Sequence, residues 1–152
     1  MDPSQLHVLL IGIDAYDGGG SLTGCVNDVD AMQQVLLDRL GVPAERIKRL
    51  VSPRTGVRHD SRIDGELPTL DNIKRELDRL ANDEAQSTDR VFIFYSGHGT
   101  QLKLKDQNGR RFAREAILPK DKVRGAGYRF LLDWEINDAI NKICQRCHSA
   151  TF

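Results

Sequence analysis

Short apolar runs that alternate with amphipathic segments are the feature that most constrains the fold of this chain. Residues 7–13 (His-Val-Leu-Leu-Ile-Gly-Ile) and 90–95 (Arg-Val-Phe-Ile-Phe-Tyr) each have the length and composition of a strand buried on both faces, and residues 46–51 form a shorter one. Strands that alternate with helices indicate an α/β architecture with a mostly parallel sheet and right-handed crossovers. In such a sheet, ligands and catalytic groups gather at the carboxyl ends of the strands.

Three segments space their apolar residues as amphipathic helices do. The first begins with Asn27 or Asp28 near its N-cap and stops at Gly41, while Thr69 caps the second and Asp133 the third. The faces expected to turn inward carry Val29, Met32, Val35, Leu36 and Leu40; Leu70, Ile73, Leu77 and Leu80; and Trp134, Ile136, Ala139, Ile140 and Ile143. A turn signal at residues 106–109 predicts a hairpin over residues 102–118, and residues 150–152 resemble the start of a strand.

Residues 52–68 form a long polar connection between two of these elements. The segment contains Pro53, glycines and the three arginines Arg54, Arg58 and Arg62, and it exceeds the usual length of a connection. We therefore predict a mobile loop that is open to proteolysis. A self-processing loop and a plain disordered insertion both fit this composition.

Composition excludes several classes of function. The 152 residues include 22 Lys+Arg and 22 Asp+Glu, so no basic surplus favours nucleic acid as the main ligand. No apolar run reaches the ~18 residues that span a bilayer, and the N-terminus has no signal-peptide pattern, so we expect one cytoplasmic domain over residues 1–152 without membrane contact. The three cysteines, Cys25, Cys144 and Cys147, are too few and too irregular for a disulfide framework or a complete zinc site.

His98 is the first candidate for chemistry. It lies between two glycines just beyond the buried run at residues 90–95, where its imidazole can be exposed and the Gly99 N–H is unobstructed by a side chain. A general base beside an oxyanion donor has this arrangement. A surface histidine in a tight turn has the same local sequence, so the motif alone leaves both interpretations open.

The order of several motifs along the chain resembles the caspase-like cysteine peptidases. These are Ile11-Gly-Ile-Asp14, Gly24-Cys-Val-Asn-Asp28, Thr69-Leu-Asp-Asn-Ile73, Val91-Phe-Ile-Phe-Tyr-Ser-Gly-His-Gly99, Ile117-Leu-Pro-Lys-Asp121 and Leu132-Asp-Trp-Glu135. The similarity is greatest to metacaspases and their bacterial relatives, the orthocaspases and the caspase-like domains of the CHAT type. It implies a caspase-haemoglobinase-like three-layer sandwich, of which this chain would be the N-terminal, large-subunit part.

The resemblance also implies roles for particular residues. His98 matches the histidine of the family's Cys–His dyad, and Gly99 matches the residue whose N–H helps form the oxyanion hole. Cys25, Asp28 and Ser96 match positions that line the S1 pocket, where a carboxylate receives the Arg or Lys before the cleaved bond. For Cys25 a small buried hydrophobe remains an alternative, and for Asp28 a helix cap.

The nucleophilic cysteine is the main departure from the family pattern. Cys147-His-Ser149 mimics the family's nucleophile segment, and its separation from His98 is close to the roughly 50 residues of caspases. However, Cys147 follows the polar end of a helix instead of a buried strand. We therefore expect the nucleophile to lie just beyond Phe152, supplied by the remaining C-terminal part of the domain or by a second chain.

No metal or cofactor is expected. Calcium-dependent metacaspases carry clustered acidic residues after the histidine, whereas here Lys103, Lys105, Arg110, Arg111 and Arg114 dominate, which is typical of a solvated hairpin face.

Taken together, the motifs and the resemblance predict a cysteine endopeptidase that cleaves proteins after Arg or Lys and is inactive as this isolated chain. The alternative is a pseudo-enzyme or interaction module with the same fold; a nucleotide-binding domain is disfavoured because the glycine fingerprint is missing.

Overall fold

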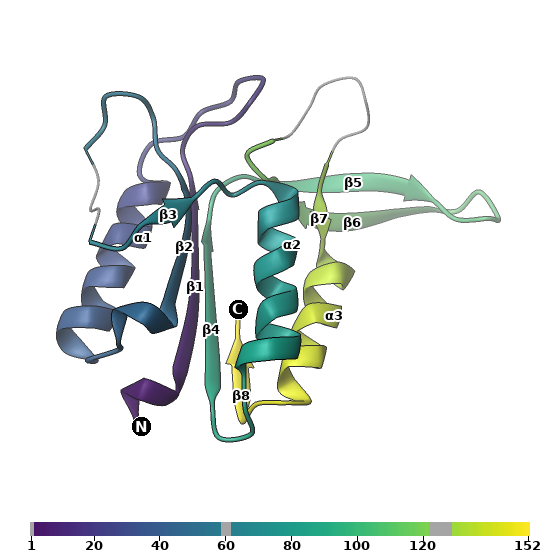
Figure 1. The fold of residues 1–152 in the computed structure, drawn as a ribbon. Coiled ribbons are helices and arrows are strands. Elements are labelled where there is room, and N and C mark those ends of the chain that lie inside the picture. Colours follow the sequence, from purple (N-terminus) through teal and green to yellow (C-terminus); the bar gives the residue numbers. More distant parts are fainter. Residues whose placement is uncertain (1, 59–61, 122–128) are drawn as a thin grey trace.

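A five-stranded parallel sheet forms the centre of the molecule (Figure 1). The computed structural model describes residues 2–58, 62–121 and 129–152. The strand order is β3-β2-β1-β4-β8, with bounds β1 Leu6–Ile13, β2 Ile47–Ser52, β3 Gly65–Glu66, β4 Arg90–Ser96 and β8 Ser149–Thr151. All four neighbouring pairs are parallel. The predicted strands at residues 7–13, 46–51, 90–95 and 150–152 are therefore confirmed.

Helices cover both faces of this sheet, because β1 is apolar on both sides. Leu9, Ile11 and Ile13 pack in one cluster with residues of α2 (Leu70–Arg79) and α3 (Asp133–Cys144). Val8 and Leu10 pack in a second cluster with α1 (Cys25–Gln34). The result is the helix–sheet–helix sandwich expected for the α/β class.

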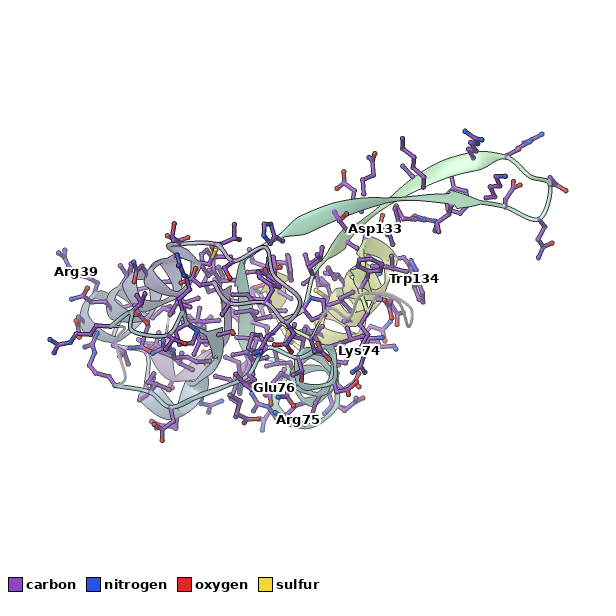
Figure 2. The ribbon with its side chains drawn as sticks, turned by 90° about the horizontal axis from the view of Figure 1, so that it is seen from above. Arg39, Lys74, Arg75, Glu76, Asp133 and Trp134 are labelled. Atoms are coloured by element: carbon purple, nitrogen blue, oxygen red, sulfur yellow. The ribbon has the colours of Figure 1, made fainter. Side chains whose placement is uncertain are left out.

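A second, antiparallel sheet leaves the carboxyl end of β4. It consists of β5 (Gly99–Lys105), β6 (Arg111–Ile117) and β7 (Leu131–Leu132) in that order. The predicted hairpin is thus present, and its turn closes with a hydrogen bond from Asp106 N–H to Arg110 O and with Gly109 at a φ of 76°. Figure 2 shows that this hairpin projects away from the rest of the molecule.

Two predicted helix caps are wrong, and Thr69 is confirmed. The N-cap of α1 is Gly24, at a φ of 111°, and the carboxylate of the buried Asp14 takes the place of a capping side chain by accepting the Cys25 N–H at 2.8 Å. The N-cap of α3 is Leu132 instead of Asp133, because Glu135 Oε2 accepts the Leu132 N–H at 3.0 Å.

The expected inner faces also need correction at three positions. Trp134, at the start of α3, is 53% exposed (Figure 2). Val35 and Leu40 are exposed as well, since α1 continues into a π-helical turn over Val35–Arg39 whose wider winding shifts the register of the apolar stripe.

Part of the segment 52–68 is attached to the sheet. Gly65 and Glu66 pair with Arg49 and Leu50 as β3, and Ile63 packs against the α1-side cluster. Residues 59–61 lie outside the described residues. The mobility and protease sensitivity of the segment stay predictions.

Gly12 allows α1 to approach β1 closely. A Cβ at this position would lie 2.8 Å from both Cys25 O and Val29 Cγ2. We predict that Gly12→Ala lowers the free energy of unfolding by ~1–3 kcal/mol, as overpacking of a core does. The measurement is urea unfolding followed by circular dichroism.

Gly99→Ala is the matched control, since among the described residues the nearest atom to a Cβ at Gly99 is Ala116 O, at 3.8 Å. Equal stabilities of the two variants would contradict the close packing of α1 on β1.

Candidate active site

The parallel register of β1 and β4 brings two loops to one edge of the sheet. Gly12 pairs with Ser96 near the carboxyl end of both strands. The loop after β1 leads to the start of α1 at Cys25, and the loop after β4 carries His98. Residues far apart in sequence are therefore in contact: Gly20, on the first loop, contacts His98, and Asp28, on the first turn of α1, contacts Ser96 at the end of β4.

The imidazole of His98 is held by a backbone carbonyl. Its Nε2 lies 2.6 Å from Gly20 O. A carbonyl oxygen only accepts hydrogen bonds, so Nε2 must carry the proton in this contact. In the neutral ring the other nitrogen, Nδ1, is then unprotonated and available as a base.

Two tyrosines fix the backbone of His98. The Tyr16 hydroxyl accepts the His98 N–H at 2.7 Å, and the two rings are 5.0 Å apart between centroids. The Tyr95 hydroxyl lies 2.8 Å from His98 O and 3.1 Å from Leu118 O. Burial is the main cause that raises the pKa of both tyrosines, so both hydroxyls stay neutral.

Gly97 is required by the same arrangement. A Cβ on this residue would lie 2.6 Å from Tyr95 Oη and 2.7 Å from Tyr16 Oη. The glycine before His98 therefore makes room for the two hydroxyls that hold the histidine.

The N–H of Gly99 is directed away from the hairpin. In antiparallel sheets, paired residues alternate between those that bond each other and those that point their backbone groups outward. Leu118 N–H donates to His98 O, and Asp106 N–H donates to Arg110 O, which assigns the bonded pairs to the even-numbered residues of β5. Gly99 belongs to the residues that do not bond their partner, so its N–H points away from β6. An oxyanion donor needs an N–H that the sheet does not use.

Cys25, Asp28 and Ser96 also lie together. The Ser96 hydroxyl donates to Asp28 Oδ2 at 2.8 Å, and Asp28 is exposed on the first turn of α1. Burial raises the pKa of the Cys25 thiol, which a hydrogen bond with Ser96 only partly offsets. The cluster thus presents one carboxylate beside a neutral thiol and a hydroxyl.

Cys147 lies at the opposite end of the sheet from His98. Ser149, two residues later, pairs with Arg90 at the start of β4, whereas His98 follows the end of that strand. The thiol is buried, donates to Ser149 O at 3.3 Å, and has a pKa raised mainly by burial. The structure therefore does not bring Cys147 to the candidate active site.

A groove of about 500 Å³ lies beside Gly99, between the base of the hairpin and the start of α3. Its lining combines the apolar Ala116, Ile117 and Ile136 with the carboxylates of Glu115 and Asp133. The groove thus begins at the residue that directly follows His98.

The described residues contain neither a group of three potential metal ligands nor a helix long and apolar enough to cross a membrane.

Tyr16, Gly20 and Tyr95 are site residues that the sequence analysis missed. The two tyrosines bond backbone atoms of His98, and Gly20 contributes its own carbonyl oxygen. Contacts that involve backbone atoms leave no pattern of side chains in the sequence. The one available signal is their position, because each follows or ends a predicted strand at the edge where ligands bind.

Comparison with known proteins shows the family. Residues 7–151 match the family model described as metacaspase, peptidase C14 domain. The chain is 36% identical to metacaspase-6 of Arabidopsis thaliana over 93% of its own length and 37% of that protein, and 36% identical to metacaspase-1A of Aspergillus oryzae over 79% of its length and 26% of that protein. The chain therefore belongs to the metacaspases, a family of caspase-like cysteine peptidases.

A solved structure shares the fold. Protein GSU0716 from Geobacter sulfurreducens superposes with a TM-score of 0.59 at 18% identity, covering 96% of this chain and 47% of that one. This chain thus spans about a quarter to two-fifths of the curated relatives and about half of the solved structure.

The burial of two thiols predicts a definite order of alkylation. At neutral pH, iodoacetamide should modify the exposed Cys144 first, because burial both covers Cys25 and Cys147 and raises their pKa, which lowers the thiolate fraction. Mass spectrometry of the modified peptides gives the order, and the urea-unfolded chain, in which all three react, is the control. Cys25 reacting first would show it to be an activated thiol.

Proposed function

We propose that this chain supplies the histidine half of a cysteine endopeptidase that cleaves proteins after Arg or Lys. The observation that carries the proposal is the 2.6 Å contact between His98 Nε2 and Gly20 O at the carboxyl edge of a metacaspase sheet. It leaves Nδ1 as the base, next to the outward N–H of Gly99. A thiol base and an oxyanion donor on consecutive residues are the two groups that acyl transfer requires.

The reaction begins with a proton transfer. His98 Nδ1 takes the proton of the cysteine thiol, and the thiolate attacks the carbonyl carbon of the scissile peptide bond. The Gly99 N–H donates to the oxyanion that forms. The tetrahedral adduct collapses, the C–N bond breaks, and His98 returns its proton to the leaving amine. Water, deprotonated by the same nitrogen, then hydrolyses the thioester and releases the thiol.

Gly20 O supports His98 through these steps. As Nδ1 gains a proton, the imidazole becomes cationic, and a carbonyl oxygen on Nε2–H stabilises that cation. Tyr16 and Tyr95 act as positioning residues, since they hold the His98 backbone without reaching the reacting atoms.

Asp28 is the proposed acid of the S1 pocket. Its exposed carboxylate is oriented by Ser96, which leaves Oδ1 free of that bond for a guanidinium or ammonium group. A neutral Cys25 thiol forms the adjacent wall without competing for the cation. An acidic side chain would be repelled from this pocket.

The proposed nucleophile comes from residues outside 1–152. Thr151 pairs with Phe92, four positions before Ser96. A strand that continued β8 in this register would reach the level of Ser96, and hence His98, about four residues further on. The continuation of the same polypeptide, or a second chain, can supply this strand.

Replacing His98 tests the assignment of the base. In the complete protein, His98→Ala should abolish cleavage of a fluorogenic Arg substrate, while the midpoint of thermal unfolding changes little because the imidazole is only half-buried. His148→Ala is the control, since His148 is exposed at the other end of the sheet. Near wild-type turnover in the His98 variant would refute the assignment.

A second substitution tests the pocket. Asp28→Asn keeps the size of the side chain and removes its charge, so kcat/KM for Arg and Lys substrates should fall by more than about tenfold, because a covered cation loses its partner. Asp38→Asn, on the exposed π-helical turn after α1, is the matched control. An equal loss on substrates with a neutral P1 residue would mean that Asp28 only stabilises its helix.

A further inference from the structure

The projecting hairpin concentrates positive charge on a chain with a formal net charge of zero. We call residues 99–117, the strands β5 and β6 with their turn, the basic arm. It carries Lys103, Lys105, Arg110, Arg111 and Arg114 against Asp106 and Glu115. Figure 2 shows the arm extending into solvent, away from the sheet and helices.

The register of the arm places like charges face to face. Lys105 is directly opposite Arg111, and Lys103 lies two residues earlier on the same face of the hairpin. Among the described residues, none of these three side chains has an ion pair, and the carboxylate of Asp106 is bonded to the N–H groups of Asn108 and Arg110, both at 2.8 Å. Directly opposed like charges destabilise a hairpin. The repulsion between Lys105 and Arg111 therefore destabilises the arm itself.

The arm also has an open edge. β5 is the outer strand of its sheet, and its odd-numbered residues direct their backbone N–H and C=O away from β6. Beyond Gly99 at the base of the arm, these residues are Gln101, Lys103 and Lys105. They offer backbone groups to a further strand, and Lys103 and Lys105 add cationic side chains on one face of the arm.

The opposite face of the arm carries three apolar side chains, beside which Arg114, the partner of Leu102, places its guanidinium carbon 5.7 Å from the centre of the Phe112 ring. Leu102 and Leu104 lie there with Phe112, which is the partner of Leu104 and is 40% exposed. A two-stranded hairpin with an exposed apolar face has little stability of its own. The side chains of a third strand paired with β5 would pack beside Leu102 and Leu104.

We propose that the basic arm binds an extended acidic segment of a partner protein, which adds to the free edge of β5. Carboxylates at alternate positions of that segment face Lys103, Lys105 and Arg111, and the intervening apolar residues lie beside Leu102, Leu104 and Phe112. A second copy of this chain is disfavoured, because pairing two β5 edges would bring lysines against lysines. The balanced charge of the whole chain disfavours nucleic acid.

The test measures binding of a defined probe to the full chain. A fluorescein-labelled peptide of alternating Glu and Val should bind with an affinity that falls as salt is raised, whereas a Lys-Val peptide should not bind. Arg111→Glu should weaken binding by about tenfold or more. Arg39→Glu, the same change at an exposed site far from the arm (Figure 2), should leave the affinity unchanged. On binding, hydrogen exchange should slow at the amides of Gln101, Lys103 and Lys105.

The melting temperature of each variant distinguishes a loss of binding from a loss of folding. Because Arg111→Glu removes the opposed charges, its melting temperature should equal or exceed that of the wild type. Lys103→Glu, opposite Ala113, serves as a second variant if the first fails to fold. Equal affinities of the arm variants and Arg39→Glu, no binding of the Glu-Val peptide, or binding only of an oligonucleotide or of anionic vesicles would each overturn the proposal.

Discussion

The parallel pairing of β1 with β4 is the interaction on which the rest of the structure depends. β1 is buried along its whole length, with β2 on one side and β4 on the other. Its register sets Gly12 beside Ser96, so that the two loops carrying polar residues leave the sheet at the same edge. The close approach of α1 at Gly12 then brings Asp28 to Ser96. Packing of the apolar core thereby determines the geometry of the polar site.

Hydrogen bonds that involve backbone atoms hold His98 in place. His98 contributes its N–H to Tyr16, its carbonyl to Tyr95 and Leu118, and its ring to Gly20 O. Buried hydroxyls with raised pKa values keep these bonds over the neutral pH range, since neither tyrosine ionises there. A glycine on each side of His98 makes this possible, because Gly97 leaves room for the hydroxyls and Gly99 exposes its N–H. The imidazole is thus oriented independently of the nucleophile.

Much of the fold could be predicted from the sequence, because apolar periodicity reports burial directly. The strands at residues 7–13 and 90–95, the cap at Thr69 and the hairpin all follow from local pattern. The cap of α1 could not be predicted in this way. The first N–H of this helix bonds the carboxylate of Asp14, which lies outside the helix, and not a side chain at Asn27 or Asp28. Trp134 shows a similar limit, since helical spacing does not tell which neighbours are present to cover a face. For the site, the resemblance indicated residues that the structure brings together, whereas Tyr16 and Gly20 depend on tertiary contacts.

The tautomer of His98 tests the account most directly, because it does not require an active enzyme. Long-range proton–nitrogen NMR spectra at about pH 8, where an ordinary imidazole is neutral, distinguish the protonated nitrogen from the unprotonated one. We predict a single tautomer for His98 with the proton on Nε2, and a mixture of tautomers for the exposed His148 as internal reference. A proton on Nδ1 of His98, or a mixture like that of His148, would contradict the role of Gly20 O and of Nδ1 as the base.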